Sequence, residues 1–148
     1  MQKQEEKVMI QALTDQTFTK VCIDSGAGES VCPIDAFPSY GTHKTAKTGV
    51  RYTAAGGQEL INAGEKRPHF KCGGANAHMA FQCTDVHKPL AAASKVAQKG
   101  NRIVLEADGG HILNLKTGTK IPLTIENGVY MMEMLVKPVA PFQGQANP

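Results

Sequence analysis

The chain has 148 residues, of which 41% are hydrophobic and 20% are charged, which is enough for one hydrophobic core but hardly for two. Sixteen lysines and arginines against thirteen acidic residues give a formal net charge of +3, well short of the dense positive surface of a dedicated nucleic-acid-binding protein. No apolar run approaches the roughly 20 residues that span a bilayer, and the polar first residues are unlike a secretory signal. We therefore expect a soluble, single-domain chain in the cytoplasm.

Glycines and prolines divide the chain into short segments. Fifteen glycines and eight prolines separate apolar or alternating runs, a pattern typical of an all-β protein. Residues 1–6 are expected to form an N-terminal tail, residues 7–136 one domain, and residues 137–148 a proline-rich linker. The expected strands are Lys7–Leu13, Thr17–Asp24, Gly49–Ala54, Glu59–Asn62, His69–Cys72, His78–Val86, Arg102–Ala107, His111–Lys116, Lys120–Ile125 and Val129–Val136.

One helix is expected at Leu90–Lys99, because this stretch is rich in helix-forming residues. Pro89 stands just before it, and Gly100 follows it at the position where helices commonly end. The helix is short, so we expect it to pack one face against the sheet.

The four cysteines do not need to form a disulfide framework in a chain of this length, so free thiols are expected. Cys72, His78, Cys83 and His87 place four potential zinc ligands within sixteen residues, but their spacing matches no zinc finger or knuckle. In addition, an offset of five along the expected strand puts His78 and Cys83 on opposite faces. A zinc or nucleic-acid adaptor, or a nucleophilic Cys83–His87 pair, stays only as a minor alternative.

The most informative segment runs through Asp24, where the apolar residues Val21-Cys22-Ile23 are followed directly by Asp24-Ser25-Gly26. A carboxylate at the end of a buried strand is costly unless it is hydrogen-bonded. Gly26 lets the backbone fold tightly and bring N–H groups toward the Asp24 oxygens. The Ser25 hydroxyl can bond back into the loop or across to a partner chain. Taken by itself, the tripeptide is also typical of an ordinary turn.

In its context, Asp24-Ser25-Gly26-Ala27, followed by Glu29-Ser30-Val31, resembles the active-site loop of retroviral-type aspartic proteases, the retropepsins. Farther along, residues 49–62 form two alternating arms around a small-residue tip, which is similar to the flap of that family. The strand and helix over residues 81–99 and the final run over residues 129–136 are similar to the elements that close the family's core and dimer interface. The segment before the helix departs from the family pattern, because it lacks the usual glycine.

The resemblance implies an all-β fold: a retropepsin-like closed β-barrel with a flap hairpin and one short C-terminal helix, and with its active site at a homodimer interface. It also implies which residues form the site. The implied catalytic residues are Asp24, Ser25 and Gly26, and the implied substrate-binding residues are Ala27, Gly28, Glu29, Ala55, Gly56 and Gly57.

Aspartic proteolysis needs two carboxylates about 3 Å apart that share one proton, one acting as base toward a water and one as acid toward the scissile carbonyl. The chain has a single Asp-Ser-Gly sequence, so the second carboxylate must come from another copy across a two-fold axis. We therefore expect a homodimeric aspartic endopeptidase that processes a retrotransposon-type polyprotein at acid to near-neutral pH. No metal or organic cofactor, membrane or nucleic-acid partner is expected.

A second interpretation stays open. The same β fold can serve as a catalytically inactive module for dimerisation or peptide binding. The intact Asp24-Ser25-Gly26 sequence favours the protease.

Overall fold

The computed structural model describes residues 17–139. Within this range there are thirteen strands and one short helix, which confirms the all-β class. The elements are β1 (Thr17–Asp24), β2 (Val31–Pro33), β3 (Arg51–Thr53), β4 (Glu59–Ile61), β5 (Gly64–Lys66), β6 (His69–Cys72), β7 (Ala75–His78), β8 (Phe81–Thr84), β9 (Leu90–Ala92), α2 (Ala93–Gln98), β10 (Asn101–Glu106), β11 (Gly109–Asn114), β12 (Lys120–Glu126) and β13 (Val129–Val136).

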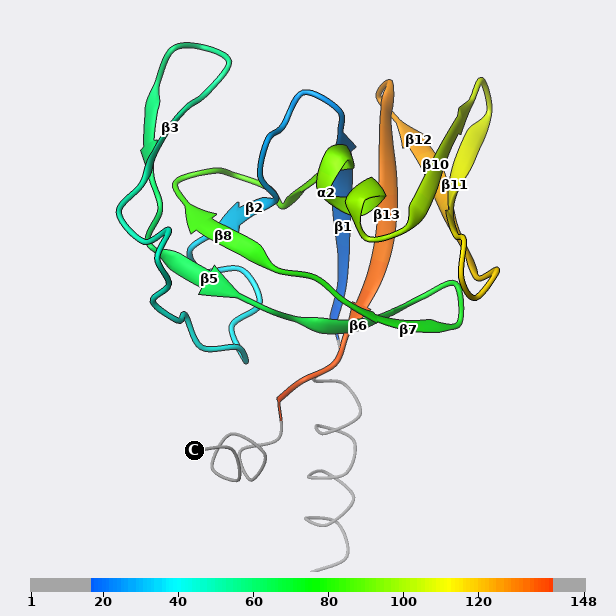
Figure 1. The fold of residues 1–148 in the computed structure, drawn as a ribbon, viewed down its shortest axis with the longest axis horizontal. Coiled ribbons are helices and arrows are strands. Elements are labelled where there is room, and N and C mark those ends of the chain that lie inside the picture. Colours follow the sequence, from blue (N-terminus) through cyan, green and yellow to red (C-terminus); the bar gives the residue numbers. More distant parts are fainter. Residues whose placement is uncertain (1–16, 140–148) are drawn as a thin grey trace, which may run out of the picture.

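Eleven of these strands form one sheet, in the order β10-β11-β12-β13-β1-β9-β2-β8-β5, with β6 and β7 attached through β13. β1 runs through the middle of the molecule, antiparallel to β13 and parallel to β9 (Figure 1). β3 and β4 form a separate two-stranded hairpin that projects away from the sheet. The end of β1, which carries Asp24, is therefore held in place by the neighbouring strands.

The closed barrel that the resemblance implied is not found among residues 17–139. The path of paired strands has two ends, β10 and β5, and no ladder joins them. Closure requires a continuous ladder around the barrel, whereas the outer edge of β5 carries only an isolated bridge between His43 and Glu65. β6 pairs with β13 at two positions only, which makes a branch instead of a closing seam.

The core forms where the alternating faces of these strands meet. In β13, Met132, Met134 and Val136 point inward at every second position and are buried, as expected for a strand with one solvent-facing side. Phe70 and Phe81 are buried with them in the same cluster. Burial of each large apolar side chain contributes about 1.5–3 kcal/mol, so this cluster is the main source of stability for the strands around Asp24.

The sequence-based strands agree with the structure to different degrees. β1, β6 and β13 have the predicted bounds, and β3, β4, β10, β11 and β12 overlap with their predictions. The strand expected at His78–Val86 is broken, because His78 ends β7 and only Phe81–Thr84 forms β8. β2, β5 and β9 were not predicted, since strands of three residues are too short to show a period. The strand expected at Lys7–Leu13 lies outside the described residues.

The helix is shorter than its prediction. Leu90–Ala92 does not start the helix but forms β9, which pairs with the last three residues of β1. The strand forms despite the high helix propensity of alanine, because Ala91 and Ala92 are completely buried against the sheet. No helix within residues 17–139 is long and apolar enough to cross a membrane.

The start of the expected C-terminal linker is attached to the domain. The backbone N–H of Lys137 donates to the carbonyl of His69 at 2.9 Å, and the carbonyl of Lys137 accepts a hydrogen bond from the Tyr40 hydroxyl at 2.6 Å. The ordered contacts therefore continue past Val136, while residues 140–148 of the expected linker lie outside the described range.

Candidate active site

Asp24 is the last residue of β1 and lies beside Ala92 of β9 in the parallel ladder. The N–H of Gly26 donates to its Oδ1 at 2.8 Å. Among residues 17–139 no other hydrogen bond to the Asp24 side chain is found. Asp24 is half-buried, so its carboxylate is oriented by the loop and still reachable from outside this chain.

The loop after Asp24 is tied back into the sheet by Ser30, which is buried. Its hydroxyl accepts a hydrogen bond from the N–H of Ala92 at 3.0 Å, and its carbonyl accepts one from the N–H of Gln82 at 2.8 Å. Both ends of the loop are thus fixed to the same sheet. This makes Ser30 an anchor of the Asp24 loop.

The remaining loop residues are more exposed. Ser25 lies on the surface, and within the described part of the chain its hydroxyl has no hydrogen-bond partner. Gly28 has open space around the position of a side chain, and Ala27 and Gly28 are both at least partly accessible. These residues present a surface that a peptide or a second chain can contact.

The hairpin β3–β4 carries the other predicted substrate-binding residues. Ala55, Gly56 and Gly57 form its exposed tip, and Gly57 adopts a φ of +84°, which favours glycine. The N–H of Gly57 donates to the carbonyl of Ala54 at 2.9 Å and closes the turn. The hairpin and the loop after Asp24 extend toward the same end of the molecule (Figure 1), although no hydrogen bond joins the tip to that loop among residues 17–139.

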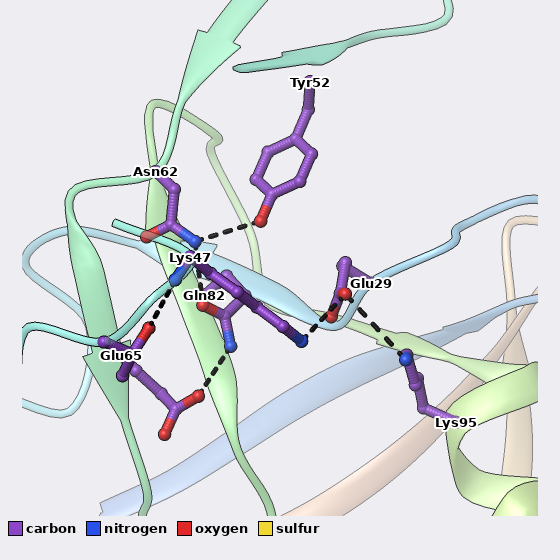
Figure 2. A network of polar contacts seen from close by, with 8 residues as sticks. Glu29, Lys47, Tyr52, Asn62, Glu65, Gln82 and Lys95 are labelled. Atoms are coloured by element: carbon purple, nitrogen blue, oxygen red, sulfur yellow. Dashed lines mark hydrogen bonds and ion pairs between the residues drawn. The ribbon is translucent and has the colours of Figure 1, made fainter. Parts of the chain in front are cut away.

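A chain of polar contacts fixes the base of the hairpin, as Figure 2 shows. Asn62 Nδ2 donates to the Tyr52 hydroxyl at 2.9 Å and to Gln82 Oε1 at 2.8 Å. Gln82 Nε2 in turn donates to Glu65 Oε1 at 2.8 Å, and Arg67 Nε donates to Glu65 Oε2 at 2.6 Å. Asn62, Glu65 and Gln82 are buried, so their polar groups depend on one another for partners.

Glu65 keeps its charge in this network. Burial raises the pKa of its carboxyl, but the hydrogen bonds from Gln82 and Arg67 outweigh burial and leave the pKa below its ordinary value. The network therefore contains a fixed negative charge.

Glu29 joins the Asp24 loop to two other elements. Its Oε1 accepts from Lys47 Nζ at 3.0 Å, and Lys95 Nζ of α2 lies 3.9 Å from the same oxygen (Figure 2). The hydrogen bond with Glu29 raises the pKa of Lys47 above its ordinary value, so Lys47 is charged at neutral pH. Because Lys47 precedes β3, this pair connects the loop to the base of the hairpin.

Sequence reasoning selected Glu29 but not its partners. Lys47 and Lys95 read as ordinary surface lysines, and the buried amide network spans separate segments of the chain. One signal was available: Gln82 stands between Phe81 and Cys83 in an apolar strand, where an amide needs a buried partner.

The cysteines and histidines of the expected zinc alternative are dispersed. Cys83 Sγ faces Cys32 Sγ at 3.9 Å in the core, whereas His78 is at the end of β7 and outside that core. All four cysteines are free. Within residues 17–139 no group of three or more His, Cys, Asp and Glu side chains is placed to hold a metal ion.

Comparison of the chain with protein-family models, with curated proteins and with solved structures gave no match.

Proposed function

We propose that this chain is an aspartic endopeptidase of the retropepsin type, which acts as a homodimer on a retrotransposon-type polyprotein. The observation that carries the proposal is the position of Asp24, at the end of a central strand with one oxygen held by the N–H of Gly26. The order of strand, Asp-Ser-Gly loop, hairpin, strand, helix and final strand supports the same proposal. As part of this proposal, the open sheet is the monomer half of a retropepsin-like fold.

The chemistry requires Asp24 from two copies. None of the other four aspartates, Asp15, Asp35, Asp85 and Asp108, is followed by Ser-Gly or Thr-Gly, so they are not candidates for a second acid held like Asp24. In the dimer, one Asp24 carboxylate takes a proton from water, and the water oxygen attacks the scissile carbonyl carbon. The other Asp24 donates its proton to the carbonyl oxygen. The first Asp24 then passes the proton it took from water to the nitrogen, the C–N bond breaks, and the second Asp24 regains a proton from the oxygen, which restores both carboxyls.

The hairpin β3–β4 is assigned the role of a flap. Its exposed tip at Gly56 and Gly57 offers backbone groups to an extended peptide, and closure over the peptide excludes water. The polar contacts at Asn62 and Lys47 hold its base, so movement is expected at the tip.

The test is cleavage of a mixed peptide library between pH 4 and 7 by the wild-type chain and by Asp24→Asn. Asp35→Asn is the matched control, because it makes the same chemical change at an aspartate outside the site. We expect cleavage by the wild type and by Asp35→Asn, loss of cleavage in Asp24→Asn, and inhibition by pepstatin. Activity per chain should rise steeply with protein concentration, since two copies form one site.

The cavity described below fits equally a second candidate function, a catalytically inactive module of the same fold for dimerisation or peptide binding. A chain that forms a dimer and binds peptides but cuts none between pH 4 and 7 contradicts the protease and supports the module.

A further inference from the structure

A cavity of about 590 Å³ lies beside Glu29, between the Asp24 loop, β7, α2 and strands β11 and β12. Its apolar lining includes Phe70, Val96, Ile112 and Met132. Its polar lining includes five residues of the network in Figure 2: Glu29, Lys47, Glu65, Gln82 and Lys95. An apolar pocket with a few convergent polar groups is the usual form of a ligand site.

Most of the polar groups on this wall are already occupied. Both oxygens of Glu65 accept hydrogen bonds, and both ends of the Gln82 amide are used. Lys47 donates to Glu29. Glu65 and Gln82 therefore shape the wall but have little capacity left for a ligand, whereas the Lys47 ammonium keeps two of its three donors.

Lys95 is different. Its Nζ lies 3.9 Å from Glu29 Oε1, which is too far for a hydrogen bond, and an ammonium group has three donors. Its side chain is 41% exposed, so a ligand can reach it. Since Glu29 faces two lysines, this cluster carries one excess positive charge, and Lys99 adds another on the cavity lining.

We propose that this cavity is a subsite for an acidic side chain of a bound peptide, with the carboxylate at Lys95 Nζ and the aliphatic stem on the apolar lining. The inference rests on the proposed function for the role of the peptide as a substrate. A basic side chain is disfavoured, because it must compete with Lys47 for Glu29. A neutral amide gains a hydrogen bond but not the ionic attraction.

The test is peptide binding by Asp24→Asn, which keeps the cavity and removes cleavage. Fluorescent peptide libraries are compared in which one position at a time is fixed as Glu, Gln or Lys, and binding is read by anisotropy. At one position we expect Glu to bind about tenfold more tightly than Gln, as is typical of a charge-assisted hydrogen bond. The preference should weaken as salt is added.

Charge reversal provides the matched comparison. In the Asp24→Asn background, Lys95→Glu should abolish the preference for Glu and favour Lys at the same position. Lys88→Glu makes the same charge change on a loop outside the cavity and should leave the preference intact. Glu29→Gln, which removes the competing carboxylate, should strengthen it. Thermal unfolding of each variant establishes that it is folded.

Equal binding of Glu, Gln and Lys libraries, or equal effects of Lys95→Glu and Lys88→Glu, overturns the inference. Failure of the proposed function is seen separately, because a wild-type chain that cleaves nothing leaves the binding comparison valid. If the wild type cleaves peptides but no position prefers Glu, the subsite is contradicted and the proposed protease function is not.

Discussion

The hydroxyl of Ser30 accepts a hydrogen bond from the backbone N–H of Ala92 at 3.0 Å, and Ala92 is the residue that pairs with Asp24 in the parallel ladder. One side chain thus ties the end of the Asp24 loop to the strand beside Asp24. Because Ser30 is 4% exposed, water cannot easily replace this contact. The position of the carboxylate depends on a residue farther along the chain, at the other end of its own loop.

Replacing Ser30 with alanine tests this anchor. Ser30→Ala leaves the Ala92 N–H without a partner in a buried position, so we expect a loss of about 1–3 kcal/mol in the free energy of unfolding. Urea denaturation followed by circular dichroism gives this value. Ser94→Ala removes a hydroxyl from α2 that is outside this contact and should change stability by no more than about 0.5 kcal/mol. Similar values for the two variants would show that the Ser30 hydroxyl does not hold the loop.

The buried amide network predicts a larger cost at Gln82. Gln82→Leu keeps a side chain of similar size but leaves Asn62 Nδ2 and the charged Glu65 Oε1 each without one partner. We expect a loss of about 2–4 kcal/mol in unfolding free energy, because two buried groups, one of them charged, each lose a hydrogen-bond partner. The measurement is again urea denaturation. Gln58→Leu, at the exposed hairpin tip, is the control, and an equal effect there would contradict the network.

The loop around Asp24 could be predicted from sequence because its signals are local. An apolar run, an acid and a glycine stand next to each other, and the alternating pattern of β1 and β13 sets their bounds. The structure places the Gly26 N–H on Asp24 as this pattern suggests.

The wall of the cavity could not be predicted in the same way. The sequence Gly64-Glu65-Lys66 is typical of a charged loop, yet it forms a buried strand. Both charged side chains have hydrogen-bond partners: Glu65 accepts a hydrogen bond from Gln82, and Lys66 Nζ donates to the carbonyls of Ile34 and Ala36. Gln82 is seventeen positions from Glu65 in the sequence, and the partners of Lys66 are farther still. Charge normally predicts exposure, and only the fold shows where that rule fails.

Glu65 makes stability depend on pH in a defined direction. Burial raises the pKa of its carboxyl, but hydrogen bonds from Gln82 and Arg67 outweigh that effect, and the folded pKa lies below its ordinary value of 4.5. Its contribution to stability is therefore present above about pH 4.5 and is lost as the pH falls through the folded pKa. Glu65→Gln lacks this titration.

The urea midpoints of the wild type and Glu65→Gln should differ most above about pH 5 and approach each other below about pH 4. Glu106→Gln, at an exposed glutamate, should track the wild type across the range. A difference between wild type and Glu65→Gln that stays constant with pH would show that the carboxylate charge is not what the network stabilises.

The four thiols should react in an order set by burial. Cys32, Cys72 and Cys83 are buried, whereas Cys22 is half-buried, and burial raises the pKa of Cys72 to about 12. Iodoacetamide at pH 8 should therefore modify Cys22 first, as measured by mass spectrometry of peptides, because the thiolate is the reactive form. The other three should react only in urea. If Cys72 or Cys83 is labelled as fast as Cys22 in the folded chain, the burial of these two thiols in the core is contradicted.

The same experiment probes the surroundings of Asp24. Burial and, secondarily, the negative charge of Asp24 raise the pKa of Cys22 above its ordinary value. Asp24→Asn removes that charge, so the pKa of Cys22 should fall and its labelling at pH 8 should become faster. Asp35→Asn is the control and should leave the Cys22 rate unchanged. If both variants label Cys22 at the wild-type rate, the Asp24 carboxylate does not act on the thiol two residues before it, and burial alone raises the pKa of Cys22.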